Sequence, residues 1–266
     1  MKICRTISIS ALFIFISIFS FAQQNTTDRT NGGVFKPVDS SPPPQVVSKS
    51  SRTYVPPATD LYQSAYNLAM QNEDYPTAIT MEYLRLAKDT TNAGIKDTLA
   101  ALYFAQGRFD KSVLLGNQVL AREPYNLKAR MLVAVSEQQL GEYGDALDHM
   151  QIIYAQTKNI DDLYSIAQLQ YFLQRFGECN QSLSNLISNP DSRMQQVTMS
   201  DPGRKSETVH IITAAYYMKG EIAKQMNQVN DAQKYFQQAL LYNPDFQLAQ
   251  KEIDDFNSQN NTPKKN

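Results

Sequence analysis

The residues best suited to acid–base, nucleophilic or metal chemistry are few and scattered in this sequence. The two histidines, His149 and His210, lie far apart, and neither has the Cys/His spacing of a zinc site. Cys179 would act as a nucleophile only beside a base, and its position favours a small, buried side chain instead. No glycine-rich phosphate loop or Ser–His–acid set is visible. We therefore expect no catalytic residues, no metal site and no cofactor.

Two pairs of adjacent carboxylates remain as candidates for acid–base chemistry. They are Asp161–Asp162 and Asp254–Asp255. Neighbouring residues on a helix point about 100° apart, so neither pair converges on one substrate. The first pair falls at an expected helix start, where negative charge complements the helix dipole, and we expect the second on a solvated face. An enzyme is therefore the third interpretation of this chain, and it would require acidic side chains from several helices to meet in one cleft.

The charge balance excludes classes of partner. The 266 residues include 25 basic and 26 acidic side chains, which gives a formal net charge of −1. Such a chain provides no positive field for phosphate backbones or anionic lipids. We expect no nucleic-acid partner.

The N-terminus has the order of a secretory signal peptide. Lys2 and Arg5 precede an uncharged apolar run, and the small residues Ser20 and Ala22 stand just before Gln23. An uncleaved membrane anchor is the alternative, but the apolar run is shorter than the roughly 20 residues that a bilayer span needs. We expect residues 1–22 to be removed, which leaves a net charge of 23 − 26 = −3 and an exported protein without direct membrane insertion.

Polar residues, a Gly pair and Pro runs dominate residues 23–58. Such a segment cannot bury enough apolar surface to offset its ordering entropy, so we expect a disordered tether. A less favoured interpretation makes its SSPPPQ stretch a docking motif for a proline-binding module. Cys179 is the only cysteine after residue 22, so no internal disulfide can form.

The elements that would position any site follow a 34-residue repeat, with units starting at Thr59, Ala93, Leu127 and Asp161. Within a unit, apolar residues at three- and four-residue spacing indicate a helix. A Gly follows where the chain must turn, and a second helix begins a few residues later. Three slots recur: bulky residues at Tyr75, Phe109 and Tyr143; small residues at Ala78, Ser112, Ala146 and Ala232; and turn residues at Gly107, Gly141 and Asn227.

These slots resemble the tetratricopeptide repeat. The best-fitting unit is the fifth, through Tyr216, Gly220, Ala232, Phe236, Ala239 and Pro244, and the second fits through Leu99, Ala100, Tyr103, Gly107, Phe109, Ser112 and Pro124. In the fourth unit, deleting one residue brings Cys179 into the small slot. In the first, Glu82 and Arg85 replace the usual apolar and small residues, which suits a terminal unit with one solvated face.

The resemblance covers residues 59–190, which hold repeats one to four, and 210–246. It implies an all-α, right-handed superhelical array of about five helix-turn-helix hairpins. We expect repeat five and a capping helix over 210–256 and a flexible tail over 257–266. Residues 191–209 belong to no repeat. They are expected as a surface loop that is either functional or merely tolerated, or as a segment that folds inward over the groove.

In this family the first helix of each repeat lines a concave groove that binds protein segments. Asn67 and Lys128 fit the chaperone-type carboxylate clamp, but Gln63, Thr98 and Leu132 stand where Lys, Asn and Arg are needed, so we do not expect that ligand. What remains is an apolar stripe, which either contacts a partner or is ordinary core. The predicted groove residues are Asn67, Phe104, Lys128, Met131, Leu132, Val135, Ile166, Leu169, Phe172, Tyr217 and Met218.

Together these features predict an exported, non-catalytic scaffold or adaptor with an unidentified protein or peptide partner. The FAQQ junction at residues 21–24 resembles exported proteins of the Bacteroidota, which implies the periplasm or cell envelope of a Gram-negative bacterium. The alternative is an architectural spacer that associates with copies of itself.

Overall fold

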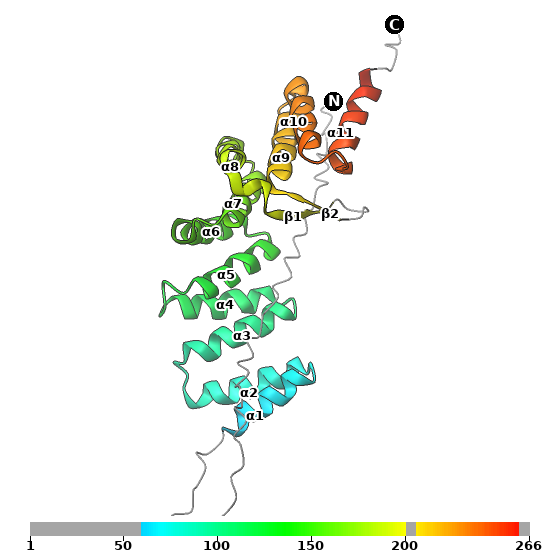
Figure 1. Cartoon of the computed structure of the whole chain (residues 1–266). Helices are drawn as coiled ribbons and strands as arrows, with labels where there is room; N and C mark the ends of the chain where they lie inside the picture. Colours follow the sequence, from blue (N-terminus) through cyan, green and yellow to red (C-terminus); the bar gives the residue numbers. More distant parts are fainter. Residues whose placement is uncertain (1–59, 201–205, 261–266) are drawn as a thin grey trace, which may run out of the picture. The chain divides into compact units, whose positions relative to one another are not determined.

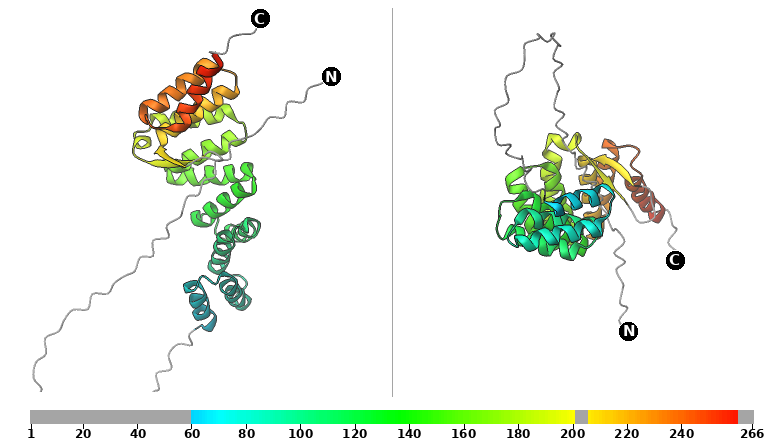
Figure 2. Two further views of the ribbon diagram at one scale, coloured as in Figure 1. Left: turned by 90° about the vertical axis from the view of Figure 1, so that its right-hand side faces the viewer. Right: turned by 90° about the horizontal axis from the view of Figure 1, so that it is seen from below.

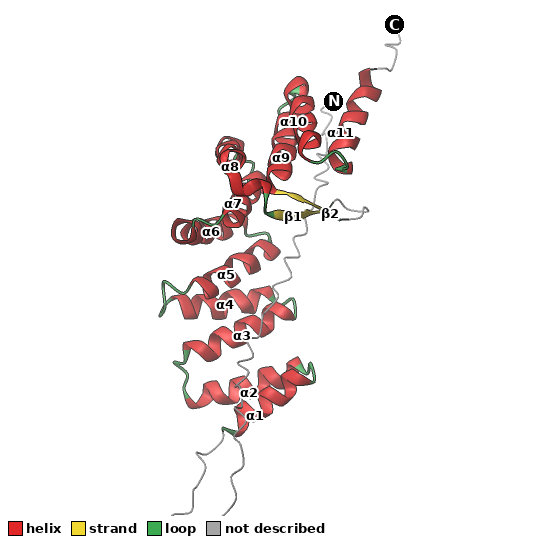
Figure 3. Cartoon of the chain, viewed as in Figure 1, coloured by secondary structure: helices red, strands yellow, loops and turns green. Residues whose placement is uncertain are grey.

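The computed structural model describes residues 60–200 and 206–260. The predicted signal peptide and tether, and the tail beyond residue 260, lie outside these residues. Within them the chain forms eleven α-helices, a short 3-10 helix and two strands (Figures 1 and 3). No helix in this part of the chain is both long and apolar enough to cross a bilayer.

The helices follow one another as antiparallel pairs, and in every view successive helices lie side by side (Figures 1 and 2). The pairs are α1 (Leu61–Gln71) with α2 (Tyr75–Lys88), α3 (Ala93–Ala105) with α4 (Phe109–Leu120), α5 (Leu127–Leu140) with α6 (Tyr143–Thr157), α7 (Ile160–Phe172) with α8 (Phe176–Ser188), and α9 (Ile211–Gln225) with α10 (Val229–Tyr242). A single helix, α11 (Gln247–Asn260), packs on α10. The predicted fold class, five hairpins and a capping helix, is confirmed. The capping helix continues past Phe256, so residues 257–260, which we expected to be loose, are helical.

Each hairpin turns through one residue in the left-handed backbone region. These residues are Glu73, Gly107, Gly141, Gln174 and Asn227, with φ between 56° and 81°. A left-handed residue lets the N–H groups after the helix return to its last carbonyls. In the third hairpin, for example, the Glu142 N–H donates to the Glu137 carbonyl at 2.9 Å. Only two of the five positions use glycine, so the other turns accept backbone strain.

Small side chains allow the two helices of a hairpin to approach. The predicted small slot is fully buried in all five units, at Ala78, Ser112, Ala146, Cys179 and Ala232. In the fifth hairpin the approach extends to Gly220, where an added Cβ would lie 2.5 Å from the Phe236 ring. In the first hairpin, however, Glu82 is fully buried and pairs with Arg85 at 2.6 Å. The expected solvated face is therefore wrong at Glu82, because this side chain fills the interior position between the helices.

The segment between α8 and α9 forms a small β-hairpin rather than a loop. It contains η1 (Pro190–Arg193), β1 (Gln196–Met199) and β2 (Glu207–His210), and the two strands pair antiparallel. Alternate residues of β1 are buried, with Val197 and Met199 turned inward. Their inward faces join the largest apolar cluster of the described chain, which runs from α7 to α11.

Substitutions at Gly141 and Gly144 can distinguish the effect of backbone strain on stability from the effect of helix propensity. We expect Gly141→Ala to lower the free energy of unfolding by about 1 kcal/mol, because alanine resists the left-handed region and no atom lies within 4 Å to clash. The control Gly144→Ala, inside α6 and equally open, should raise it by about 0.5–1 kcal/mol. Equilibrium urea unfolding measures both, and two changes of the same sign would contradict this assignment.

Candidate functional site

The inner faces of α1, α3 and α5 carry the first part of the predicted groove. Asn67 is exposed on α1 and accepts a hydrogen bond from the Gln63 side-chain amide at 3.0 Å. Lys128 of α5 pairs with Asp97 of α3 at 2.8 Å, and its side chain remains 60% exposed. These polar groups are accessible, and the ion pair crosses from one repeat to the next.

Between them lie four half-buried apolar residues, which we call the inner row: Phe104, Met131, Leu132 and Val135. All four are partly exposed, and contacts with the core hold Phe104, Met131 and Leu132 in place. The Phe104 ring meets Phe109 edge-on, with ring centroids 5.4 Å apart. Met131 packs against the cluster of α5, α6 and α7, and Leu132 packs against the cluster centred on α3. The inner row is therefore positioned by the core without being covered by it.

The predicted stripe does not continue onto α7 and α9 as an exposed surface. Ile166 and Leu169 are buried against α5 and α6. Tyr217 is buried between the rings of Phe236 and Phe246, at centroid distances of 5.4 and 5.3 Å. Met218 is also buried. The prediction that these four residues are exposed is wrong, because packing in three dimensions covers them.

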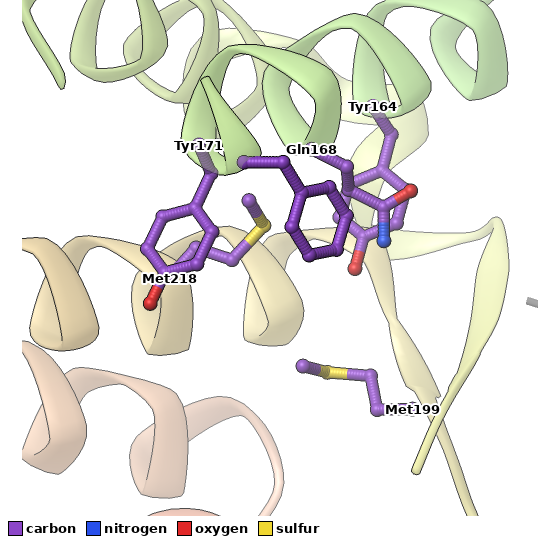
Figure 4. Close-up of a pocket in the computed structure, with 6 residues that line it drawn as sticks. Tyr164, Gln168, Tyr171, Met199 and Met218 are labelled. Atoms are coloured by element: carbon purple, nitrogen blue, oxygen red, sulfur yellow. The ribbon is translucent and has the colours of Figure 1, made fainter. Parts of the chain in front are cut away.

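Strand β1 covers part of this second half, at Met218 and Phe172. Figure 4 shows Met199 reaching from the strand into the space between the α7 side chains Tyr164, Gln168 and Tyr171 and Met218 of α9. The cavity left there is about 10 Å³, which holds at most about one water. Phe172, the remaining groove residue, lines the same space and stacks on Tyr143 with ring centroids 4.9 Å apart.

Polar contacts anchor this cover at both ends. The Glu207 carboxylate accepts from the Gln247 N–H at 2.9 Å, at the start of α11. The Ile211 N–H donates to the Gln195 carbonyl at 3.0 Å. With its amide in the hydrogen-bonding orientation, Gln195 also donates to Asp161 at 2.8 Å. The inserted segment thus braces α7, α9 and α11, which agrees with the inward-folding alternative from the sequence.

Sequence reasoning missed Met199 as a residue that covers part of the groove and Val197 as a core residue. A signal was present, since QVTM alternates polar and apolar residues shortly before a turn-forming Asp-Pro-Gly. Four-residue alternation is too short to separate a strand from a loop without the apolar surface that it covers.

Comparison with known proteins identifies the fold that this arrangement of helices has. Residues 213–246 match the tetratricopeptide-repeat family model. The described helices also superpose on solved structures of tetratricopeptide-repeat proteins. This chain has the tetratricopeptide-repeat fold.

Three of the similar solved structures indicate the distance of the relationship. A crystal structure of the MamA protein has a TM-score of 0.54 at 16% identity, covering 68% of this chain and 90% of that one. YrrB, described as a TPR protein with an unusual peptide-binding site, has a TM-score of 0.56 at 12% identity, covering 71% and 89%. MamA from Desulfovibrio magneticus RS-1 has a TM-score of 0.53 at 10% identity, covering 70% and 95%. No curated protein matches the sequence significantly.

The candidate chemical residues occupy structural positions in this repeat array. Cys179 is buried and donates to the Ala167 carbonyl at 3.1 Å, and burial raises the pKa of its thiol to about 12. Within the described ranges, no three His, Cys, Asp or Glu side chains are grouped as metal ligands. His149 lies on α6 with its side chain against Arg130 and Glu137 of α5, whereas His210 immediately precedes α9.

Three titratable residues of the third repeat, Arg130, His149 and Glu137, lie in contact in that order. Arg130 donates to Nδ1 of His149 at 3.0 Å, so a neutral His149 carries its proton on Nε2, 3.6 Å from the Glu137 carboxylate. Burial lowers the pKa of His149, and the positive charge of Arg130 lowers it further. Burial, together with the charges of Asp145, Glu142 and Asp148, raises the pKa of Glu137 to about 7. Both shifts favour the neutral forms.

The first site prediction concerns Met199, the β1 residue that packs against Met218 and Phe172. We expect Met199→Ala to lower the free energy of unfolding by about 2–5 kcal/mol, since it removes a fully buried side chain and leaves a void against Met218 and Phe172. Gln196→Ala, on the exposed face of the same strand, should change it by less than about 0.5 kcal/mol. Urea unfolding followed by circular dichroism compares them, and equal losses would refute the covering role.

The second site prediction is a pH dependence. Because the folded-state pKa of Glu137 exceeds that of the unfolded chain, its stabilisation is complete below about pH 4 and is lost as the pH rises through about 7. The lowered pKa of His149 acts in the opposite direction and reduces stability as the pH falls below about 6.5.

We therefore expect Glu137→Gln to gain stability relative to the parent protein between pH 5 and 8. Unfolding free energies measured at four pH values test this. The control Glu178→Gln, an exposed acid on α8, should follow the parent curve. A Glu137→Gln curve parallel to the parent would contradict the shift.

Proposed function

We propose that this chain is an exported, non-catalytic scaffold that binds a segment of another protein along the inner faces of α1, α3 and α5. The observation that carries this proposal is the inner row, whose four apolar side chains remain partly open while Ile166, Leu169, Tyr217 and Met218 of the predicted stripe are buried. A partner that covers the inner row would gain hydrophobic free energy without any need for the array to open.

The chemistry of the surface favours a peptide segment. Methionine and aromatic side chains adapt to different apolar partners. At the two ends, Asn67 and the exposed ammonium of Lys128 offer hydrogen bonds to backbone carbonyls or to acidic side chains. YrrB, a neighbour in fold that is described as having a peptide-binding site, supports this class of ligand.

The export proposal rests on residues 1–22, whose basic start, apolar run and small-residue exit are those of a signal peptide. We place the scaffold in the periplasm or cell envelope of a Gram-negative bacterium. In that compartment Cys179 stays unpaired, because it is the only cysteine after residue 22.

A self-associating spacer is the second candidate, and α1 favours it. Leu61 and Leu68 are 78% and 61% exposed on this first helix, whereas α11 covers the last hairpin. Two such exposed leucines on the first described helix of a repeat array would suit contact with another copy.

Site-specific photo-crosslinking in the native cell separates these functions. The photoreactive residue replaces Gln138, a half-buried inner-face residue beside the inner row, and in a matched control it replaces exposed Leu114 on α4. Both variants must first match the parent protein in helicity and melting temperature.

We expect a discrete adduct with another protein from position 138 and none from position 114. An adduct at twice the chain mass would instead favour self-association. Adducts from both positions in equal amounts, or from neither, would refute recognition by the inner row. Cell fractionation of the same samples tests export, and protein confined to the cytoplasm would refute that part.

A further inference from the structure

A second, polar cavity opens between α8, α9 and α10, away from the inner row. Its volume is about 280 Å³, far above the roughly 10–15 Å³ that a single water requires. None of its lining residues belongs to the predicted groove. They are Asn180, Lys219, Ile222, Ala223, Gln228, Asp231 and Tyr235.

Lys219 is the one cation among the described residues that line this cavity. Its Nζ donates to Ser184 Oγ at 2.9 Å, and that hydroxyl in turn donates to the Asn180 carbonyl at 2.8 Å. The ammonium also lies 5.6 Å from the centre of the Tyr235 ring. These contacts hold the amine in place but bring no negative charge, and in the described chain no carboxylate lies within 4.0 Å of it.

Lys224 on the same helix is a lysine whose charge is balanced by carboxylates of the chain. It contacts Glu221 at 2.7 Å and Glu252 of α11 at 2.5 Å. The neighbouring carboxylates raise the pKa of Lys224 despite the opposing effect of its burial, whereas burial lowers the pKa of Lys219. Burial without a counter-ion destabilises the charged form of a lysine. A ligand carboxylate would therefore give Lys219 the negative charge that Glu221 and Glu252 give to Lys224.

The other lining groups define the charge of the ligand. The side chains of Asn180, Gln228 and Tyr235 are hydrogen-bond donors that have no hydrogen-bond partner within the described residues. Asp231 lies on the same cavity and would repel a dianion such as phosphate more strongly than a monoanion. One cation, several neutral donors and one acid therefore match a single carboxylate.

We propose that the cavity between α8, α9 and α10 binds a carboxylate, which pairs with the Lys219 ammonium and accepts hydrogen bonds from the uncharged donors around it. The carboxylate belongs to a small organic acid or to an acidic or C-terminal residue of a peptide. This site is separate from the inner row and does not depend on the function proposed above.

Titration of the full chain, followed by NMR of ¹³C-labelled lysine and of ¹³C-labelled isoleucine methyl groups, tests the site. The probes are sodium acetate, acetyl-Ala-Glu-Ala-amide and acetyl-Ala-Ala-Ala with a free C-terminus, each compared with sodium chloride at equal ionic strength. The variants are Lys219→Gln, the charge-preserving Lys219→Arg and the control Lys234→Gln. Lys234 is exposed on α10 and does not line the cavity.

We expect at least one carboxylate probe to shift the Lys219 signal saturably and to raise the pKa of Lys219. Lys219→Gln should weaken binding at least tenfold, read from the Ile222 methyl signals, while Lys219→Arg and Lys234→Gln stay within about threefold of the parent. Saturation by acetate alone identifies a small acid as the ligand, and tighter binding of a peptide identifies its source as a protein.

Three results would overturn the proposal. The first is the absence of saturable binding by any probe, and the second is an equal response to chloride, which would indicate an adventitious ion only. The third is unchanged binding by a folded Lys219→Gln protein. Because none of these readouts uses the inner row, the site can fail while the proposed scaffold function stands, and the reverse also holds.

Discussion

Close approach of paired helices at small side chains is the constraint on which the rest of this structure depends. One fully buried small residue per second helix, such as Ala146 or Cys179, sets how near the two helices of a hairpin can lie. Within the fifth hairpin an added Cβ at Gly220 would lie 2.5 Å from Phe236, and between the second and third hairpins one at Gly116 would lie 2.4 Å from Val133, so even a methyl group would not fit. This spacing determines which faces of the first helices are left over for other contacts.

Those remaining faces are used in two ways along the chain. In the first three hairpins the inner side chains are only half covered, and an ion pair from Lys128 to Asp97 joins adjacent repeats across the surface. On α7 and α9 a neighbouring repeat, Phe236 and Phe246 bury three of the inner side chains, and Met199 of the β-hairpin nearly fills the space before Phe172 and Met218. One half of the array therefore keeps an accessible inner surface, while the other half becomes a thicker core.

For most charged residues inside the array, the cost of burying a charge is offset by an ion pair or by a shift toward the neutral form. Glu82 is buried beside Arg85, and Lys224 is held by Glu221 and Glu252, so these charges have partners in the chain. Glu137 and His149 instead shift toward neutral forms, because burial disfavours charge on either group. Lys219 has no carboxylate within 4.0 Å among the described residues, and burial lowers its pKa although its ammonium still donates to Ser184.

The repeat could be predicted from the order of the amino acids alone, because helix periodicity, the turn residue and the small slot are local patterns that recur in phase. Those patterns predicted hairpins and a capping helix, and their resemblance to the tetratricopeptide repeat implied inner-face positions such as Asn67 and Met131. Which of those positions stay open depends on the folded array.

Four predicted groove residues show this dependence. They share the apolar character of the inner row, and nothing in their own spacing distinguishes them from it: Ile166, Leu169, Tyr217 and Met218. Their burial depends on contacts with residues distant in sequence, namely a neighbouring repeat, Phe236 and Phe246, and the strand that carries Met199. Exposure is a property of such long-range packing, so a local pattern identifies the apolar face but not what covers it.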